Sequence, residues 1–198
     1  MTPEREKKFR KVLSNRQSDL TVVFENVHDP HNISACLRTC DAVGVSEVFI
    51  IHTSEQRFSK LGKKSSSSAS KWMDTHVFFS VEDCFDEVRR RYKKIFSTKL
   101  TVESKSIYDL NLSESVALVF GNEHEGVSAK AASLSDGNFL IPQVGMIESL
   151  NISVACAVSL YESLRQRMAA GKYDQSSLSE TELELKLKKW EGFGLRNS

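Results

Sequence analysis

The chain contains 198 residues, of which 40% are hydrophobic and 27% are charged, as in an ordinary soluble globular domain with its own core. The formal net charge is only +1, which excludes a molecule that is basic as a whole, so a polyanionic partner has to be bound by local basic patches. No apolar run reaches membrane-spanning length and the first ten residues are charged, so we expect a cytoplasmic protein with no membrane partner.

Four cysteines are present, and no two of them form a CxxC pair. Cys36 and Cys40 lie four positions apart among apolar neighbours, which puts both on one face of a predicted helix. Thiols in such a setting are typical of a buried core, so we expect no metal site.

The N-terminal residues 2–16 are predicted to form a helix with Pro3 near its start. Between Glu4 and Arg16 this segment carries six basic and two acidic residues. Such an excess of basic charge is common on a solvated helix face, and it also suits an arm that contacts RNA phosphates. Both interpretations are open at this point.

A strand is predicted at residues 20–27, a turn at 28–32, a helix closed by glycine at 33–44 and a second strand at 47–51. A strand, a helix and a strand at this spacing form a βαβ unit, which predicts a parallel sheet. Asn32 is a natural N-cap for the helix. Arg38 is harder to explain by structure alone, because the rest of the helix is rich in small and apolar residues.

The middle of the chain alternates between strands and helices. Residues 58–70 are polar, with three lysines and a run of serines, so we expect a loop there. Further strands are predicted at residues 75–79, 94–98 and 116–120, with a helix at residues 81–92. Three arginines near the end of that helix suit the helix dipole as well as they suit RNA.

The sequence GNEHEGVS at residues 121–128 follows the most apolar strand and precedes a short predicted helix at residues 129–134. It has neither the lysine of a Walker motif nor the spacing of GxGxxG. A loop that binds nucleotide phosphates is therefore not expected here.

Residues 141–161 begin with the end of an apolar strand predicted at residues 138–142. The proline of this strand takes the chain out of the sheet. A loop with Gly145 leads into a predicted helix whose first turn carries Ser149 and Asn151 and which is rich in small residues. Small side chains let other backbone approach closely, and the backbone groups of such a loop can bind an uncharged heterocycle or an amino acid. The same pattern also fits an ordinary junction between a strand and a buried helix.

The tail begins with a capping box, Ser179 followed by Glu182, and continues as an amphipathic helix with Leu183, Leu187 and Trp190 on one face. That face could pack on the body, on the N-terminal helix or on a second subunit.

Three stretches stand out together: the pair Asn32 and Arg38, the sequence GNEHEGVS at residues 121–128, and IPQVGMIESLNISVA at residues 141–155. Their order and spacing resemble the three motifs of the SpoU/TrmH family, the RNA ribose 2′-O-methyltransferases of the SPOUT class. The segments RQSDLTVVFENVHDPHN at 16–32, LRTCDAVG at 37–44, SKW at 70–72 and YESLRQRMAAGKY at 161–173 are similar to the tRNA guanosine-2′-O-methyltransferases of that family. The resemblance extends from about residue 16 to residue 173.

The resemblance implies an α/β fold with a parallel sheet, helices on both faces, a C-terminal trefoil knot, and a helix at each end. It implies a basic helical extension at residues 1–18, a methyltransferase domain at 19–172 and a helical extension at 173–198. Family members bind S-adenosylmethionine in the knot and work as homodimers whose active sites draw residues from both subunits. The implied activity is methylation of a ribose 2′-hydroxyl in tRNA, with guanosine-18 of the D-loop as the expected target.

The resemblance also assigns roles by position. The implied catalytic residues are Arg38, Asn32, Glu123, Ser149 and Asn151. The residues implied to hold S-adenosylmethionine are Gly121, Ile141, Met146 and Leu150. The residues implied to contact RNA are Lys8, Lys11, Arg16, His31, Arg165 and Arg167. The family treats the arginine as the group that activates the 2′-hydroxyl, but a guanidinium stays protonated in proteins, so a clamp on an RNA phosphate is physically easier.

Two alternatives stay open. One keeps the chemistry and moves the target to ribosomal RNA or to another tRNA nucleotide. The other is an RNA-binding module without catalysis, against which the five intact catalytic positions argue. Terminal helices without a separate RNA-binding domain favour tRNA over ribosomal RNA.

Overall fold

A computed structural model describes residues 1–53 and 69–193 of the chain. Seven strands form one sheet in the order β3-β2-β1-β6-β4-β7-β5, and every pair of neighbouring strands is parallel. The strands are β1 (Leu20–Glu25), β2 (Glu47–Ile51), β3 (Asp74–Phe78), β4 (Lys94–Ser97), β5 (Lys105–Ser106), β6 (Val116–Phe120) and β7 (Gly137–Leu140). The predicted α/β fold with a parallel sheet is confirmed.

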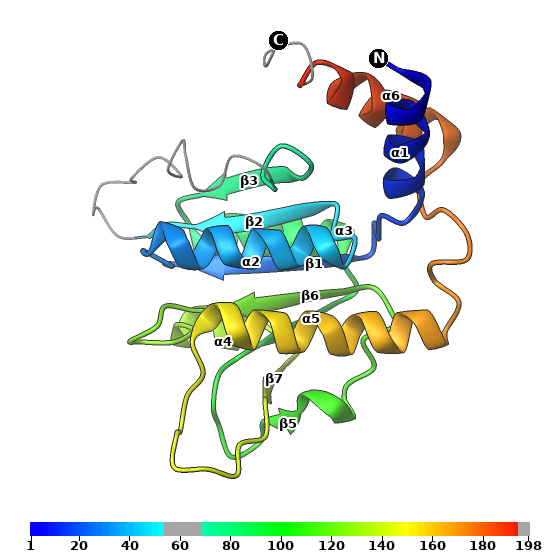
Figure 1. Cartoon of the computed structure of the whole chain (residues 1–198). Coiled ribbons are helices and arrows are strands. Elements are labelled where there is room, and N and C mark those ends of the chain that lie inside the picture. The colour runs from blue at the N-terminus through cyan, green and yellow to red at the C-terminus, as the bar shows by residue number, and fades with distance from the viewer. Residues whose placement is uncertain (54–68, 194–198) are drawn as a thin grey trace.

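Helices cover both faces of the sheet (Figure 1). They are α1 (Pro3–Ser14), α2 (Pro30–Ala42), α3 (Val81–Arg91), α4 (Ala129–Leu134), α5 (Ile152–Ala169) and α6 (Glu180–Glu191), with a 3₁₀ turn η1 (Ile107–Asp109). The helices α2 and α5 lie side by side on one face, and α3 and α4 lie on the other. Each face encloses its own apolar core, because successive side chains of a strand point to opposite faces.

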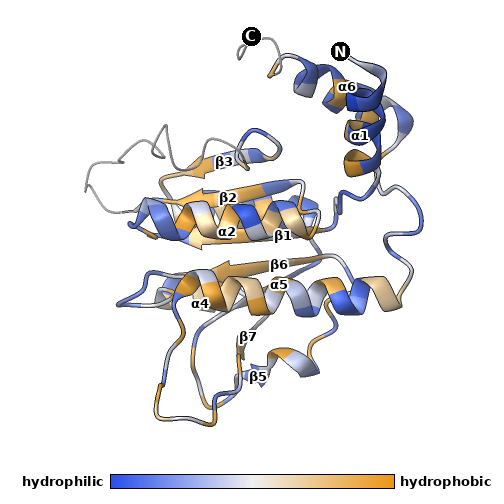
Figure 2. Ribbon diagram, viewed as in Figure 1, coloured by the Kyte–Doolittle hydropathy of each residue, from blue (hydrophilic) through white to orange (hydrophobic). Residues whose placement is uncertain are grey.

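The central strand β1 shows this alternation. Val22 and Phe24 belong to the core under α2 and α5, whereas Val23 belongs to the core under α3 and α4. All six residues of β1 are buried, as expected for a central strand covered on both faces. In Figure 2 the central strands β1, β2 and β6 are largely coloured as hydrophobic.

The helix α2 begins earlier than the sequence predicted, and this changes the position of Asn32. Asp29 is the N-cap, its carboxylate accepts the backbone N–H of His31 at 2.8 Å, and Pro30 occupies the first turn. Proline suits that position because its fixed φ is helical and the missing N–H has no partner there anyway. The prediction that Asn32 caps the helix was therefore wrong, and the Asn32 side chain is available for other contacts.

The helix α5 begins later than predicted. Asn151 is its N-cap, with the side-chain Oδ1 accepting the backbone N–H of Ser153 at 2.8 Å. Ser149 consequently lies in the loop before the helix and not on its first turn. The strand β5 and the turn η1 were not predicted, because a two-residue strand has no periodicity of its own.

The terminal helices α1 and α6 pack on each other at one end of the molecule (Figure 1). Their contact is a third apolar cluster that also includes Trp72, and the rings of Phe9 and Trp190 meet edge to face at 5.5 Å. Of the three partners open to the tail helix, the structure thus places α1 and the adjoining Trp72 against it. The capping box of Ser179 and Glu182 is confirmed. Most of the predicted loop at 58–70 lies outside the described residues.

Candidate active site

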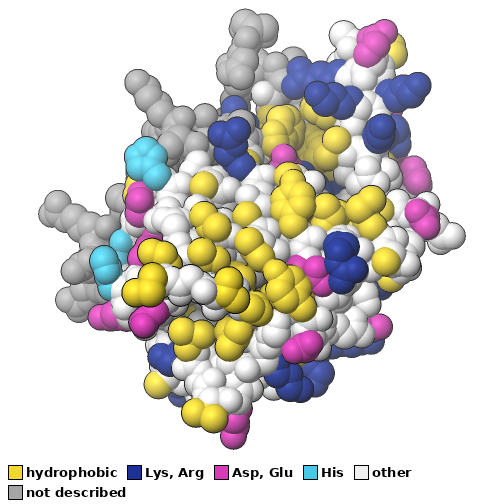
Figure 3. All heavy atoms as spheres, turned by 60° about the horizontal axis from the view of Figure 1, so that its bottom comes forward, with side chains coloured by type: hydrophobic (Ala, Val, Ile, Leu, Met, Phe, Trp, Pro, Cys, Tyr) yellow, Lys and Arg dark blue, Asp and Glu magenta, His cyan; other side chains and the backbone are white. Residues whose placement is uncertain are grey.

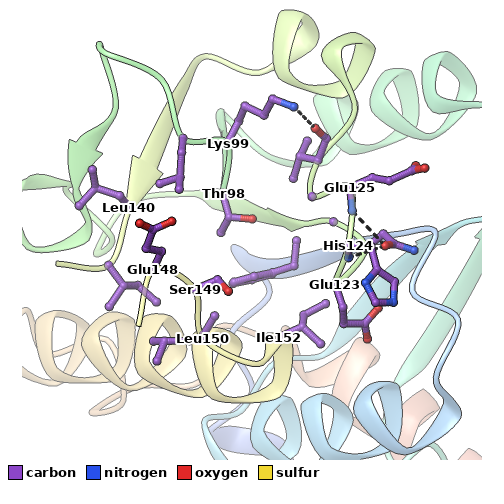
Figure 4. A pocket seen from close by; sticks show the side chains of 18 of the residues that line it. Thr98, Lys99, Glu123, His124, Glu125, Leu140, Glu148, Ser149, Leu150 and Ile152 are labelled. Atoms are coloured by element: carbon purple, nitrogen blue, oxygen red, sulfur yellow. Dashed lines mark hydrogen bonds between the residues drawn. The ribbon is translucent and has the colours of Figure 1, made fainter. Parts of the chain in front are cut away.

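A cavity of about 430 Å³ lies at the carboxyl edge of the sheet, among the loops that follow β4, β6 and β7 (Figure 4). All strands are parallel, so their carboxyl ends meet at one edge, where ligands of open α/β sheets usually bind. The apolar part of the lining includes Phe120, Phe139, Ile141, Leu150 and Ile152. The polar part includes Thr98, Glu148 and Ser149, whose side chains Figure 4 shows around the same space.

The loop after β6 closes tightly on itself. A Cβ atom on Gly121 would lie 2.1 Å from the carbonyl carbon of Gly126 and 2.2 Å from the nitrogen of Val127. Gly126 has a φ of +68°, which favours glycine, and its N–H donates to the carbonyl of Asn122 at 2.8 Å. The two glycines of GNEHEGVS therefore shape a turn whose backbone forms one wall of the cavity.

One chain of hydrogen bonds joins all three motif regions. Asn32 on α2 donates from Nδ2 to Oε1 of Glu123 at 2.7 Å, and its Oδ1 accepts from Nδ2 of Asn151 at 3.2 Å. Asn151 in turn accepts from the hydroxyl of Ser153 at 2.6 Å. The three predicted catalytic residues Asn32, Glu123 and Asn151 are thus brought together, beside a cavity that Glu123 and Ser149 line.

Arg38 lies apart from this chain. It is six residues beyond Asn32 on α2, so the rise of an α-helix separates the two by about 9 Å along the axis. Its side chain is exposed, and no residue of the described ranges forms a hydrogen bond or ion pair with it. The single chain does not bring the predicted catalytic arginine to the cavity.

Three of the four predicted cofactor positions, Gly121, Ile141 and Leu150, line the cavity. Met146 does not, because the loop at residues 142–150 lies open and the Met146 side chain is 97% exposed. Sequence reasoning missed the wall formed by Thr98, Lys99 and Leu100. These residues match no motif, and only the sheet order, with β4 beside β6, shows that they belong to the site.

Lys99 ties two walls of the cavity together. Its Nζ donates to the carbonyl oxygen of Val127 at 2.8 Å and so joins the loop after β4 to the loop after β6 (Figure 4). The contact satisfies a carbonyl next to the closed turn and restrains the opening of the cavity.

The predicted RNA contacts divide into two groups. Lys8, Lys11, His31 and Arg165 are exposed, with Arg165 held by Glu162 of the same helix at 2.7 Å. Arg16 and Arg167 are 1% and 0% exposed, so their assignment to RNA binding was wrong. Both have structural partners instead.

The guanidinium of Arg167 has protein partners for all of its nitrogens. It donates to the carbonyls of Leu112, Asp19 and Glu114, to Oε1 of Gln17 and to the carboxylate of Asp19. Arg16 donates to Asp41 and to the carbonyls of Val45 and Trp72, and its guanidinium lies over the ring of Trp190. Nothing in the sequence distinguished these two arginines from exposed ones, because their partners are mostly carbonyls far away in the chain.

The four cysteines are free and buried, as predicted for core thiols. Hydrogen bonds with Cys36 and Cys40, together with burial, raise the pKa of the Cys156 thiol well above its ordinary value, which favours the protonated form. Within residues 1–53 and 69–193, no group of three or more His, Cys, Asp or Glu side chains is arranged to hold a metal ion. In the same part of the chain, no helix combines the length and the apolar character needed to cross a membrane.

The chain is similar to known methyltransferases in sequence and in structure. A tRNA (guanosine(18)-2′-O)-methyltransferase of Thermus thermophilus is 40% identical over 177 residues, which cover 89% of this chain and 90% of the relative. The crystal structure of the TrmH/SpoU tRNA modifying enzyme of A. aeolicus superposes with a TM-score of 0.88, at 37% identity and 97% coverage of both chains. The SpoU methyltransferase AviRb from Streptomyces viridochromogenes, in complex with the cofactor AdoMet, has a TM-score of 0.69 at 25% identity, over 79% of this chain and 64% of its own.

The sequence profile of the SpoU rRNA Methylase family matches residues 19–161, which contain β1, α2, the turn after β6 and the first half of α5. This segment holds the whole hydrogen-bonded chain of Asn32, Glu123 and Asn151. The protein belongs to the SpoU methylase family.

Proposed function

We propose that this protein methylates a ribose 2′-hydroxyl of tRNA with S-adenosylmethionine as the donor, and that the target is guanosine-18 of the D-loop. The observation that carries the proposal is the hydrogen-bonded chain Glu123–Asn32–Asn151 at the rim of the cavity. It joins all three motifs of a methyltransferase family at one place. The relatives that cover 89%, 94% and 92% of this chain are tRNA (guanosine(18)-2′-O)-methyltransferases by name.

The cavity fits S-adenosylmethionine in size and in chemistry. Its volume lies in the usual range for small-molecule sites, and it combines an apolar wall with a few polar groups. Phe120, Ile141 and Leu150 offer the apolar surface that an adenine needs, while Thr98, Glu148 and Ser149 offer partners for the amino-acid end. When bound, the cofactor supplies an electrophilic methyl group on a sulfonium.

The protein's own residues orient the ribose hydroxyl and provide a positive charge for an RNA phosphate. Asn32 is held from both sides, since Glu123 accepts from its amide nitrogen and Asn151 donates to its amide oxygen, so its side chain has one orientation. Such a fixed polar group can orient a ribose hydroxyl in line with the methyl carbon. Arg38 is assigned to a phosphate of the RNA, which its planar fork binds with two parallel hydrogen bonds.

A homodimer is part of the proposal. Large hydrophobic side chains are exposed along the loop before α5 and along α5 itself: Val144, Met146, Ile147, Leu150, Val154, Tyr161 and Met168. Figure 3 shows hydrophobic side chains gathered over this face of the molecule. Ser153, Ala157 and Tyr161, which are spaced by four residues, lie on the same helix. A second copy would cover the face and bring an Arg38 to the cavity of its partner.

The trefoil knot is also part of the proposal. The strand β7 pairs with β4, on the far side of β6 from β1, and the chain then returns so that α5 packs on α2. This path after β7 supports a threaded arrangement around the cavity. A cytoplasmic location is also proposed, and an activity on tRNA supports it.

The test is transfer of a labelled methyl group from S-adenosylmethionine to unmodified tRNA, followed by mapping of the methylated nucleotide. We expect one 2′-O-methyl group per tRNA, at guanosine-18, and no transfer to a transcript with 2′-deoxyguanosine at that position. Label in ribosomal RNA but not in tRNA would assign the chemistry to the other target. Cofactor binding without transfer to either RNA would favour a non-catalytic module.

A further inference from the structure

We propose that Asn26 and Asn122 are positioning residues for the methyl transfer, because they hold the turn that presents Glu123 to Asn32. Neither residue belongs to the predicted catalytic set. The kinetic part of this inference rests on the proposed function, whereas the anchoring of the turn is a property of the free protein.

Asn26 has an unusual backbone conformation and is fixed by its neighbours. Its φ is +52°, the only positive φ of a non-glycine residue in the described part of the chain. Its N–H donates to the carbonyl of Ile51 at 2.9 Å, its Oδ1 accepts the N–H of Thr53 at 2.9 Å, and its Nδ2 donates to Oγ1 of Thr53 at 2.8 Å. Asparagine tolerates the left-handed region better than most residues, and here its side chain ties the end of β1 to the end of β2.

Asn122 connects this anchor to the turn after β6. Its Nδ2 donates to the carbonyl of Asn26 at 3.0 Å. Its Oδ1 accepts the backbone N–H groups of His124 at 2.7 Å and Glu125 at 3.2 Å (Figure 4). The same side chain therefore closes the turn around Glu123 and fastens it to the carbonyl that the left-handed conformation of Asn26 presents.

The far end of the turn has a second anchor on β1. Glu25 is 2% exposed, and its Oε2 accepts the backbone N–H of Ser128 at 2.9 Å. Asn26 and Glu25, the last residue of β1, thus hold the two ends of the segment from Asn122 to Ser128. Lys99 adds the contact with Val127 described above.

Glu123 depends on this framework for its position. Its side chain is exposed, and in residues 1–53 and 69–193 its hydrogen bond is the one to Asn32. The position of an exposed glutamate with a single partner depends on its backbone. Displacement of the turn would therefore break the hydrogen bond between Asn32 and Glu123. A shift of about 1 Å in a reacting group can reduce the rate by about 100-fold.

The experiment uses the full chain and three changes. Asn122→Ala removes the link between the turn and β1. Asn26→Gly keeps the positive φ without strain and removes the two bonds to Thr53, so it tests the anchor without a folding defect. Asn111→Ala is the matched control, since Asn111 also caps a turn, accepting the N–H of Ser113 at 3.1 Å and its hydroxyl at 2.6 Å, away from the cavity.

Two readouts are needed. Hydrogen exchange of the free protein should become about tenfold faster or more at the amides of His124 and Glu125 in Asn122→Ala and Asn26→Gly, and stay unchanged there in Asn111→Ala. Single-turnover methyl transfer to tRNA should fall by about tenfold or more in the first two variants, with unchanged affinity for S-adenosylmethionine. In a Glu123→Ala background, which lacks the acceptor for Asn32, the same changes should cost little further rate, because residues that act through one group are not additive.

Three results would overturn the inference: unchanged exchange at His124 and Glu125, a loss of cofactor affinity that accounts for the whole loss of rate, or an equal loss of rate with and without Glu123→Ala. If the wild-type protein transfers no methyl group to tRNA while the exchange pattern appears as expected, the proposed substrate fails and the anchoring of the turn stands.

Discussion

Arg38 and Arg167 lie on two helices that pack side by side, yet their surroundings give them opposite roles. Arg38 is exposed and has no partner in the described part of the chain, so its charge is available to a ligand. We expect both Arg38→Lys and Arg38→Ala to reduce methyl transfer by about 100-fold or more while S-adenosylmethionine still binds, because a lysine lacks the planar fork. The rate is measured by transfer to tRNA and the affinity by calorimetry. Near-normal turnover in Arg38→Lys would show that a point charge is sufficient.

Arg167 is a structural residue and should behave as one. Arg167→Met removes the guanidinium that donates to the carbonyls of Leu112 and Glu114 and leaves the carboxylate of Asp19 without its main cation, so we expect a loss of about 3–5 kcal/mol in the free energy of unfolding. Urea denaturation measures the change. The control is Arg165→Met, two residues away. The Arg165 side chain is 68% exposed, and its partner Glu162 keeps a hydrogen bond from the amide of Gln166 at 2.8 Å, so this change should cost about 1 kcal/mol. Similar losses in the two variants would contradict this assignment.

The roles of individual residues were only partly predictable from the sequence. Asn32, Glu123 and Asn151 are separated by up to 119 positions, and the motif spacing nevertheless brought them together correctly. Arg16 and Arg167 were misassigned, because burial and carbonyl partners depend on tertiary packing and leave no local pattern. The left-handed backbone conformation of Asn26 was not predicted either, since a positive φ at a non-glycine residue cannot be inferred from composition.

Most elements were predictable because their periodicity is strong. The strands β2 and β6 and the helix α4 have the predicted bounds, since apolar runs and capping residues mark both of their ends. The start of α2 was missed by three residues because Asp29 and Asn32 are both good caps and only the fold selects between them. The pairing of β7 with β4 could not be predicted from pattern, because register in a parallel sheet joins distant segments.

The terminal helices α1 and α6 differ in how their lysine side chains are paired. On α1, Lys8 and Lys11 are exposed and unpaired within the described residues, whereas on α6 both Lys186 and Lys189 are bound to Asp74. Lys and Arg side chains gather near this end of the molecule in Figure 3. We therefore expect the double change Lys8→Gln and Lys11→Gln to weaken tRNA binding and to reduce the slope of log affinity against log salt by about 1.5–2.

Filter binding at several salt concentrations measures that slope. The control is Lys93→Gln with Lys105→Gln, which removes the same charge from exposed positions of the body. Deleting residues 1–15 is a poorer test, because it would also uncover Trp72 and Trp190. Equal slopes in the wild type and in the Lys8/Lys11 variant would exclude α1 as a phosphate-contacting helix.

The attachment of α6 to the body should depend on pH. Burial raises the pKa of Asp74, but hydrogen bonds from Lys189 and Lys186 outweigh it, and the pKa lies below its ordinary value. A carboxylate with a lowered pKa stabilises the fold above its unfolded pKa of about 3.9, and this contribution is lost as pH falls through the folded value. We expect Asp74→Asn to lower the urea midpoint at pH 7 and to have less effect near pH 3. A constant difference between the two proteins at both pH values would contradict this linkage.

At the scale of the whole molecule, the absence of Arg38 from the lining of the cavity is the reason for the proposed second copy. If each site takes its cavity from one subunit and Arg38 from the other, two inactive variants should complement each other. We expect co-expression of Arg38→Ala with Leu100→Arg, which places a charged chain in the cavity wall, to restore about a quarter of the wild-type activity. Each variant alone should be inactive.

Methyl transfer and light scattering measure activity and mass in the same samples. No recovery in mixed dimers, or full activity of a monomer at micromolar concentration, would show that each subunit carries a complete site.

The packing of α1 against α6 has a consequence for the order in which the protein is made. Phe9 and Leu13 leave the ribosome first, but Leu183, Leu187 and Trp190, which cover them, are among the last residues to be synthesised. The central strand β1 likewise waits for β6, since Leu20 pairs with Val116. Parallel pairings between such distant segments form slowly, and the apolar face of α1 stays uncovered throughout translation. A chain that is released before α6 is complete would carry this aromatic surface into the cell as a ready contact for chaperones and proteases.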